Sequence, residues 1–182
     1  MSIYESYTKH YCNVDELQRE LLALHYCRNY QVQKVLEVNW INLQLILEFD
    51  TSAIPLSNFS VEDLELFTDL MPSIVDVIRH CHRKGWVHGD IKPSNLLYIP
   101  SNHHVKLIDF GASYRIGTDR KVLADWQVTP RFASSNQICG EGLVEPKDDW
   151  YALRQVVEQA ALYAKDGLIG STLEKWREAL KT

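Results

Sequence analysis

The hydrophobic positions in the first third of the chain change from a helical to an alternating period. Across residues 14–27, apolar side chains recur mainly at helical spacing, and Asn13 and Asp15 are of the type that caps the start of a helix. Residues 33–49, QKVLEVNWINLQLILEF, hold two runs rich in Val, Ile and Leu on either side of residues 39–42. The pattern therefore predicts a first helix followed by a hairpin of two strands.

A long amphipathic stretch begins at Ser60. The sequence SVED at its start has the spacing of a capping box, in which side chains satisfy the free backbone N–H groups of a helix. Pro72 lies inside the stretch, and because proline lacks a backbone N–H we expect it to kink or interrupt the helix. The apolar residues that share one face of this predicted helix are Leu64, Phe67, Leu70, Met71, Ile74, Val75, Ile78 and Cys81.

A second hairpin and a helical end are predicted for the rest of the chain. After Gly85, the runs LLYI and VKLI are separated by the turn-prone residues PSNHH, which indicates two short strands. Residues 112–147 show no clear period, and helical patterns follow at about 149–163 and 173–180. No repeat or flexible linker divides these elements. Their order predicts one α+β domain with a small strand-bearing N-terminal part packed on a larger helical part.

Composition narrows the classes of protein that fit this pattern. The 182 residues carry a formal net charge of −5, which argues against a general nucleic-acid binder or a protein held on an anionic membrane. The N-terminal residues lack the apolar core of a signal peptide, and no run is long enough to span a bilayer. Cys12, Cys27, Cys81 and Cys139 form no C-x-x-C pair, so we expect reduced thiols in a cytoplasmic protein.

The most informative polar residues lie in the segment WVHGDIKPSNLLYI, residues 86–99. The side chains that fit the spaced pattern H-x-D-x-K-x-x-N are His88, Asp90, Lys92 and Asn95. At ordinary residue frequencies, these four fixed positions arise by chance in about one chain in a thousand of this length. The triplet D-F-G at residues 109–111 begins nineteen residues after Asp90, which makes coincidence remote.

Together the two motifs resemble the catalytic loop and the D-F-G triplet of the protein-kinase superfamily. This resemblance implies that Asp90 accepts the proton of a substrate hydroxyl and that Lys92 contacts the γ-phosphate of ATP. It also implies that Asn95 and Asp109 hold Mg²⁺, since carboxylate and amide oxygens are ligands that this ion accepts. The implied cofactors are therefore ATP and Mg²⁺.

The resemblance extends to residues that support the catalytic loop. It implies that His88 packs beneath Phe110 and that Gly111 completes the triplet. Downstream, VTPRFASSNQ resembles the family segment G-T-P-x-Y-x-A-P-E-Q, and DDWYALRQ resembles the opening of the large buried helix. By this resemblance Thr129 faces the peptide substrate near the catalytic aspartate, and Asp149 braces the catalytic loop.

Upstream, the resemblance covers a helix and a strand of the nucleotide site. LQREL places Glu20 where the family's helix glutamate pairs with a strand lysine, although a glutamate on an amphipathic helix is also commonly solvated. LQLILEF resembles the strand that leads into the nucleotide hinge. The resemblance therefore implies Leu47 as gatekeeper and the backbone of Glu48 to Asp50 as the adenine contact, and it assigns Leu97 to the same nucleotide site.

The chain departs from the family pattern near its N-terminus. No glycine precedes Gly85, so the glycine-rich loop that covers the ATP phosphates is absent from the sequence. IYESY, the expected strand, carries Glu5, and Lys9 lies only eleven residues before Glu20. The resemblance assigns Lys9 to the nucleotide site as a substitute for the strand lysine, but this spacing favours a surface position for Lys9 over that role. We expect either a reduced kinase or a chain truncated before its first strands, with a partner protein completing the N-terminal lobe.

Two further departures concern charged pairs. Gly89 stands where many kinases have the arginine that binds a phosphorylated activation loop, so control through that pair is not expected. Asn136 replaces the glutamate of A-P-E, and the late helices that normally supply its arginine partner lie outside the sequence. The absence of this glutamate is consistent with the absence of its arginine partner, because a glutamate without that arginine would have no ion pair to make.

The fold class predicted from these features is α+β and protein-kinase-like. Residues 1–182 are expected to form a single domain, in which residues 1–50 are a partial N-terminal lobe with a few antiparallel strands and one helix. Residues 51–182 are expected to form the hinge and a larger, mainly helical C-terminal lobe that is truncated after the large buried helix.

The leading functional hypothesis is ATP- and Mg²⁺-dependent phosphoryl transfer to Ser or Thr of protein substrates by a minimal kinase. Lys92 and the Thr129-Pro130 segment favour the serine/threonine branch. A pseudokinase or interaction module with weak or no transfer is the second hypothesis. A small-molecule phosphotransferase of the aminoglycoside- or choline-kinase type is the third, because such enzymes also use HGD followed by Asn; Lys92, the Phe-Gly pair and TPRFAS argue against it. No nucleic-acid or membrane partner is expected.

Overall fold

The structure, a computed structural model, describes residues 4–123, 126–164 and 167–181. The strands are β1 Tyr4–His10, β2 Val35–Asn39, β3 Gln44–Asp50, β4 Ile54–Pro55, β5 Trp86–Val87, β6 Leu96–Ile99, β7 His104–Leu107 and β8 Tyr114–Arg115. The α-helices are α1 Val14–Tyr26, α2 Leu64–Arg83, α3 Ser135–Cys139, α4 Pro146–Ala161 and α5 Leu168–Ala179. Short 3₁₀ turns occupy Leu56–Asn58, Val61–Asp63, Pro93–Asn95, Phe110–Ala112 and Arg120–Val122.

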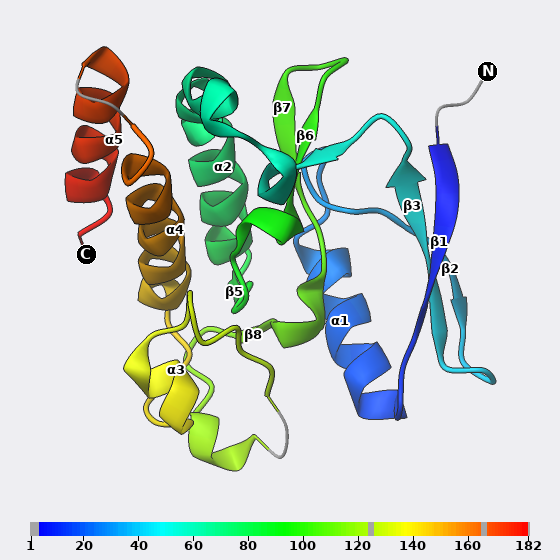
Figure 1. Ribbon diagram of the computed structural model, residues 1–182. Coiled ribbons are helices and arrows are strands. Elements are labelled where there is room, and N and C mark those ends of the chain that lie inside the picture. Colours follow the sequence, from blue (N-terminus) through cyan, green and yellow to red (C-terminus); the bar gives the residue numbers. More distant parts are fainter. Residues whose placement is uncertain (1–3, 124–125, 165–166, 182) are drawn as a thin grey trace.

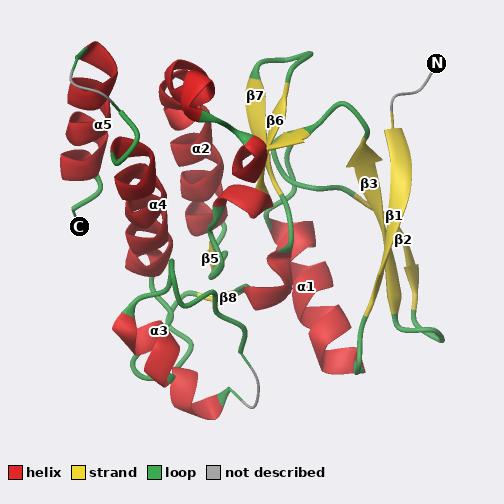
Figure 2. Cartoon of the chain, viewed as in Figure 1, coloured by secondary structure: helices red, strands yellow, loops and turns green. Residues whose placement is uncertain are grey.

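The elements are segregated along the molecule. Figure 2 shows the sheet of β1, β2 and β3 at one end and the helices α2, α4 and α5 at the other, with α1 beside the sheet. The buried face of α2 packs against β5, β7, α4 and α5, so α2 lies at the centre of the helical part. The predicted α+β arrangement, with a small strand-bearing N-terminal part on a larger helical part, is therefore confirmed (Figure 1).

The first helix begins where the sequence predicts it. The Asn13 side chain accepts a hydrogen bond from the Glu16 backbone N–H at 2.9 Å, which satisfies one of the free donors at the start of α1. Leu17, Ala23 and Leu24 are buried on the face that packs inward. The cap at Asn13 thus explains where α1 begins, and burial of one apolar face stabilises the helix.

The N-terminal sheet is antiparallel, with the strand order β1-β3-β2. The predicted hairpin of β2 and β3 is confirmed, and its turn is closed by the Asn42 backbone N–H, which donates to the Asn39 side chain at 3.0 Å. β1 pairs with β3 in a register that sets Lys9 opposite Leu45. The sheet therefore brings the N-terminal strand alongside residues that lie thirty-four to forty-six positions further along the chain.

The long helix α2 is continuous through Pro72, so of the two predicted effects, a kink or an interruption, the interruption is wrong. The predicted capping box is present ahead of it, where Ser60 and Asp63 satisfy each other's backbone groups. Pro72 lies on an exposed face, whereas Leu70 and Ile74 are fully buried on the opposite face. Burial of that apolar face stabilises the helix by more than the loss of one backbone hydrogen bond costs.

The second predicted hairpin, β6 and β7, is also confirmed, and β4 adds a third strand in the order β4-β6-β7.

The helix α4 begins at Pro146, three residues before the predicted start, because Glu145 and Asp148 form a capping box and Pro146 occupies a position where no N–H is required. Similarly, α5 begins five residues earlier than predicted, at Leu168. No helix within the described ranges is long and apolar enough to cross a membrane.

Replacing Pro72 with Ala is expected to stabilise the fold by about 1–2 kcal/mol, because the restored N–H completes the helix ladder while part of the gain is lost to a more flexible unfolded chain. Urea unfolding followed by circular dichroism measures the change. The matched control is Arg79→Ala, an exposed position two turns further along α2, which should shift stability by less than about 0.5 kcal/mol. A less stable Pro72→Ala variant would contradict this account of α2.

Candidate active site

The polar residues of the loop between β5 and β6 converge around one carboxylate. Thr129 donates its hydroxyl hydrogen to Asp90 Oδ1 at 2.7 Å, and Lys92 Nζ contacts both Asp90 Oδ2 and Thr129 Oγ1. The Asn95 amide nitrogen donates to the Asp90 backbone carbonyl at 2.9 Å. The structure thus brings together four residues that the sequence singled out, although Thr129 is thirty-nine positions from Asp90.

A buried carboxylate on α4 holds this loop in place. Asp149 accepts hydrogen bonds from the backbone N–H groups of His88, at 2.9 Å, and Gly89, at 2.8 Å. Its Oδ2 also lies 2.8 Å from His82 Nε2 on α2. Burial alone would raise the pKa of Asp149, but the contact with His82 and the backbone donors outweigh it and lower the pKa. Asp149 therefore stays ionised and connects the loop to two helices.

His82 is the member of this group that sequence reasoning missed. The pattern HCHRKG predicts only that His82 packs at or caps a helix end, and it does lie in the last turn of α2. Its contact with Asp149 joins positions sixty-seven residues apart, and its ring meets Trp150 edge-on with 5.1 Å between centroids. No local spacing in the sequence predicts such a pair.

The His88 ring links the loop to the D-F-G triplet. It meets the Phe110 ring edge-on with 4.8 Å between centroids, which agrees with the packing implied by the resemblance. His88 Nε2 donates to the Ile108 carbonyl at 3.0 Å, whereas Nδ1 accepts from the Asp90 backbone N–H at 3.3 Å. These partners place the proton on Nε2, because a carbonyl can only accept and an N–H can only donate.

Lys9 lies between two carboxylates, so the expectation of a surface lysine is wrong. Its Nζ is 2.8 Å from Glu20 Oε2 and 2.6 Å from Asp109 Oδ1. Glu20 is fully buried, and Tyr11 donates its hydroxyl hydrogen to the same carboxylate at 2.8 Å. The expected strand does begin near Glu5, but β1 continues to His10 and joins α1 through residues 11–13 alone. Eleven residues therefore suffice to place a strand lysine beside the helix glutamate.

The charges in this cluster stabilise one another. Burial would lower the pKa of Lys9, but Glu20 and Asp109 outweigh burial and raise it. Burial would likewise raise the pKa of Asp109, but the Lys9 ammonium outweighs it and lowers that pKa. The pKa of Tyr11 is raised, first by burial and then by the neighbouring Glu20. At neutral pH the Lys9 ammonium and the Asp109 carboxylate therefore stay charged, and the Tyr11 phenol stays neutral.

Asp109 is positioned by an uncommon backbone conformation and by close packing of α1. Its φ of 63° and ψ of 74° are left-handed, which turns the chain sharply at the end of β7. A Cβ on Gly111 would lie 3.3 Å from both Glu20 Oε2 and Lys9 Nζ, so the glycine permits the close approach. Arg19, which no sequence pattern identified, donates to the Gly111 carbonyl at 3.0 Å.

The residues assigned to the nucleotide site lie on β3 and β6. Leu47 is buried within β3, and Glu48 forms an ion pair with Lys106 at 2.8 Å. The Asp50 carboxylate accepts from the Ser52 backbone N–H at 2.9 Å and is buried. Leu97 on β6 pairs with Pro55 of β4, a few residues beyond Asp50. Leu47 pairs with Tyr7 of β1, two residues before Lys9 in the same strand.

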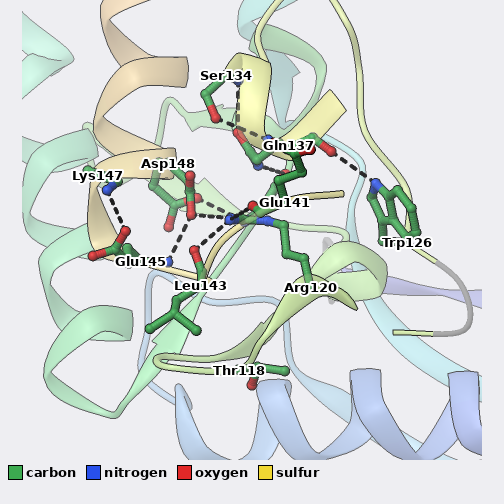
Figure 3. A network of polar contacts seen from close by, with 12 residues as sticks. Thr118, Arg120, Trp126, Ser134, Gln137, Glu141, Leu143, Glu145, Lys147 and Asp148 are labelled. Atoms are coloured by element: carbon green, nitrogen blue, oxygen red, sulfur yellow. Dashed lines mark hydrogen bonds and ion pairs between the residues drawn. The ribbon is translucent and has the colours of Figure 1, made fainter. Parts of the chain in front are cut away.

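The segment that follows the D-F-G triplet is anchored by a buried arginine (Figure 3). Arg120 forms an ion pair with Asp148, and their side chains are only 5% and 2% exposed. The Arg120 guanidinium also donates to the backbone carbonyls of Glu141 and Leu143. Asp148 in turn accepts from the Glu145 backbone N–H at 2.8 Å. This network joins residues 118–123 to the start of α4, and sequence reasoning did not detect it.

A second set of contacts in the same region leads back to the catalytic loop. Gln137 on α3 donates its amide hydrogen to the Gly89 carbonyl at 3.1 Å, and Trp126 donates to the Gln137 carbonyl at 3.0 Å. Gly140 closes α3 with a φ of 67°, and a Cβ there would lie 2.5 Å from the Trp126 ring. The helix that carries Asn136 is thus held without the ion pair that the A-P-E glutamate makes in the family pattern.

Comparison with known proteins agrees with this geometry. The protein kinase domain family matches residues 6–164, so the chain belongs to the protein kinase family, and the predicted membership is confirmed. CBL-interacting serine/threonine-protein kinase 24 of Arabidopsis thaliana is 28% identical over 135 residues, which are 71% of this chain and 30% of that protein. The SNF1-like protein kinase ssp2 of Schizosaccharomyces pombe is 29% identical over 137 residues, or 73% and 23% of the two chains.

A third relative, serine/threonine-protein kinase Kist of Homo sapiens, is 31% identical over 101 residues, which are 48% of this chain and 24% of Kist. The chain thus spans less than a third of the length of each of these three relatives. All three bear names of protein kinases. The chain therefore carries a protein kinase domain.

Arg120→Met is expected to lower the free energy of unfolding by about 3–5 kcal/mol, because the buried Asp148 carboxylate loses its cation. Urea unfolding at neutral pH measures the loss. Burial raises the pKa of Asp148 even beside Arg120, and the substitution raises it further. Since a carboxyl with a raised folded pKa weakens the fold as pH rises, the deficit of Arg120→Met should shrink when the pH falls from about 7 towards 5.

The control is the double variant Arg120→Met with Asp148→Asn, in which a neutral amide can still accept from the Glu145 backbone N–H. This variant should be more stable than Arg120→Met alone and should show a weaker pH dependence. Equal losses in the two variants, independent of pH, would show that Arg120 acts by packing alone.

Proposed function

We propose that this protein kinase domain transfers the γ-phosphoryl group of ATP, with Mg²⁺, to Ser or Thr hydroxyls of protein substrates. The observation that carries the proposal is the position of Lys9 between Glu20 and Asp109, at 2.8 and 2.6 Å. The three side chains come from a strand, a helix and the loop after β7, so only the folded protein assembles them. A lysine held this way can present its ammonium to phosphate oxygens.

Asn95 and Asp109 fit the role of Mg²⁺ ligands. Asn95 uses its amide nitrogen to bind the Asp90 carbonyl, which leaves its side-chain oxygen as a ligand. The lowered pKa of Asp109 keeps that carboxylate ionised, and its side chain is 45% exposed. Mg²⁺ prefers oxygen ligands and takes one or two carboxylates with substrate phosphates. When bound, the ion would neutralise charge on the phosphate oxygens.

The Asp90 cluster fits acceptance of a proton from the substrate hydroxyl. Its two carboxylate oxygens are oriented by Thr129 and Lys92, and the loop is fixed by Asp149. In this proposal Asp90 orients the hydroxyl and takes its proton, whereas the Lys92 ammonium contacts the transferred phosphoryl group. The Thr129 hydroxyl bridges the two side chains, which agrees with a place beside the phosphate acceptor.

Serine and threonine are the proposed acceptors, and the proposed compartment is the cytoplasm. Lys92 and the Thr129-Pro130 segment are typical of the serine/threonine branch, and the relatives above are named as serine/threonine kinases or as an SNF1-like kinase. Cys27 and Cys81 are buried as free thiols, which suits a reducing compartment. These observations support the proposal without identifying a substrate protein.

One observation favours a second candidate function, a pseudokinase or interaction module. Residues 1–84 contain no glycine, so no glycine-rich loop in this sequence covers the ATP phosphates. As a pseudokinase or interaction module, the domain binds nucleotide weakly or not at all, or a partner protein completes the phosphate site. Nucleotide binding and phosphoryl transfer must therefore be measured separately.

Transfer of labelled γ-phosphate from ATP to generic Ser/Thr protein substrates tests the first function. Asp90→Asn should reduce transfer at least about 100-fold, because a positioned general base contributes roughly 10²–10⁴ in rate. Asp76→Asn, the same change at an exposed site on α2, should leave the rate unchanged. Chelation of Mg²⁺ should abolish transfer. Transfer to aminoglycosides or choline in place of protein would favour the small-molecule alternative, and absence of all transfer would refute the kinase activity.

Equilibrium titration of ATP with and without Mg²⁺ separates a pseudokinase from a kinase. Lys9→Met should weaken binding at least tenfold, because a charge-assisted hydrogen bond contributes about 1.5–3 kcal/mol. Asp109→Ala should remove the dependence of binding on Mg²⁺. Lys175→Met, at an exposed site on α5, is the matched control and should bind as wild type does. Binding without transfer indicates a pseudokinase, and no binding by the wild type indicates an interaction module.

A further inference from the structure

A cavity of about 580 Å³ lies away from the Lys9 and Asp90 clusters. It is lined by the last turns of α1, the residues that lead into β2, and the β6–β7 hairpin. Figure 1 shows the end of α1 beside this hairpin. We refer to this cavity as the α1–β7 groove. Glu48, whose backbone the sequence resemblance assigns to the adenine contact, lines it, but none of the residues proposed for phosphoryl transfer does.

The charged side chains of the α1–β7 groove are predominantly basic. Glu48 is the one acidic residue among those described around it, and Lys106 neutralises that carboxylate at 2.8 Å. Arg28 and Lys34 are exposed, and neither forms an ion pair within the described part of the chain. The groove therefore has an excess of two positive charges on a chain whose formal net charge is −5.

The wall of the groove is apolar and contains a polar atom that lacks a partner. Leu21 and Val35 line it and are half-buried, so part of each side chain is accessible. Tyr30, which is 72% exposed, contacts the His104 ring edge-on with 5.3 Å between centroids. His104 Nε2 is buried, and no described residue hydrogen-bonds to it. An occupant can thus cover the accessible apolar surface of Leu21, Tyr30 and Val35 in this groove.

We propose that the α1–β7 groove binds an acidic segment of a partner protein that also carries apolar side chains. The argument is charge complementarity, because Arg28 and Lys34 attract carboxylates, together with the apolar wall, which a small inorganic anion would leave uncovered. The volume lies within the range of about 300–1,000 Å³ that ligand sites occupy. The occupant would contact α1, the helix that carries Glu20.

Selection from a phage library of random eight-residue peptides on the immobilised protein tests this proposal without ATP. Bound peptides should be enriched in Asp and Glu next to Leu, Ile, Phe or Trp, relative to the unselected library. The most enriched peptide, labelled with fluorescein, is then titrated by anisotropy. Arg28→Glu with Lys34→Glu should weaken its binding at least tenfold, and added salt should weaken its binding to the wild type.

The matched control is Arg83→Glu with Lys175→Glu, which changes net charge equally at exposed positions outside the groove. This pair should bind the peptide within about twofold of wild type, and thermal unfolding should show that both double variants remain folded. Hydrogen exchange with the peptide bound should decrease at the end of α1 and in the β6–β7 hairpin.

Several results would overturn the proposal. The first is a selection that yields no binding peptide, or peptides that are not enriched in Asp and Glu. The second is an equal loss of peptide affinity in both double variants. The third is protection from hydrogen exchange in parts of the chain outside the groove. Displacement of the peptide by millimolar inorganic phosphate, with equal binding of phosphate alone, would indicate a small-anion site instead. Because peptide binding is read without nucleotide, loss of this interaction and loss of kinase activity are distinguishable.

Discussion

The buried carboxylate of Asp149 is the interaction on which the arrangement of this domain depends. It is 1% exposed and is contacted by His82 on α2 and by two backbone N–H groups of the loop between β5 and β6. A carboxylate in such a place is stable only when nearly all of its hydrogen-bonding capacity is used. The position of the loop is therefore coupled to the packing of α2 against α4. Because Asp90 follows His88 and Gly89 directly in this loop, the same packing also determines where Asp90 lies.

The sequence predicted those parts of the fold and site in which local spacing carries the information. Capping by Asn13 and Ser60, both hairpins, and the spaced residues from His88 to Asn95 are features of short segments. Lys9 was misjudged because its role depends on how few residues join β1 to α1, and Pro72 because burial of the opposite helix face outweighs one missing hydrogen bond.

Other parts of the site could not be predicted, because they join residues that lie far apart in the sequence. The ion pair of Arg120 with Asp148 spans twenty-eight positions, and Arg19 reaches Gly111 across ninety-two. The local sequence around such an arginine, on a helix or in an irregular loop, does not indicate whether its side chain is solvated or buried. Only tertiary packing decides between these states, so these residues carry no signal comparable to the spaced catalytic motif.

Gly89 has a consequence for how this domain can change during evolution. Its φ is 83°, and a Cβ there would lie 2.5 Å from the Ala112 carbonyl oxygen, so the two loop backbones are in direct contact. An arginine could be acquired at this position only if the segment after the D-F-G triplet shifted as well. A single codon change to arginine would therefore strain this part of the backbone, and a tolerated arginine would require compensating changes in the segment that contacts Gly89.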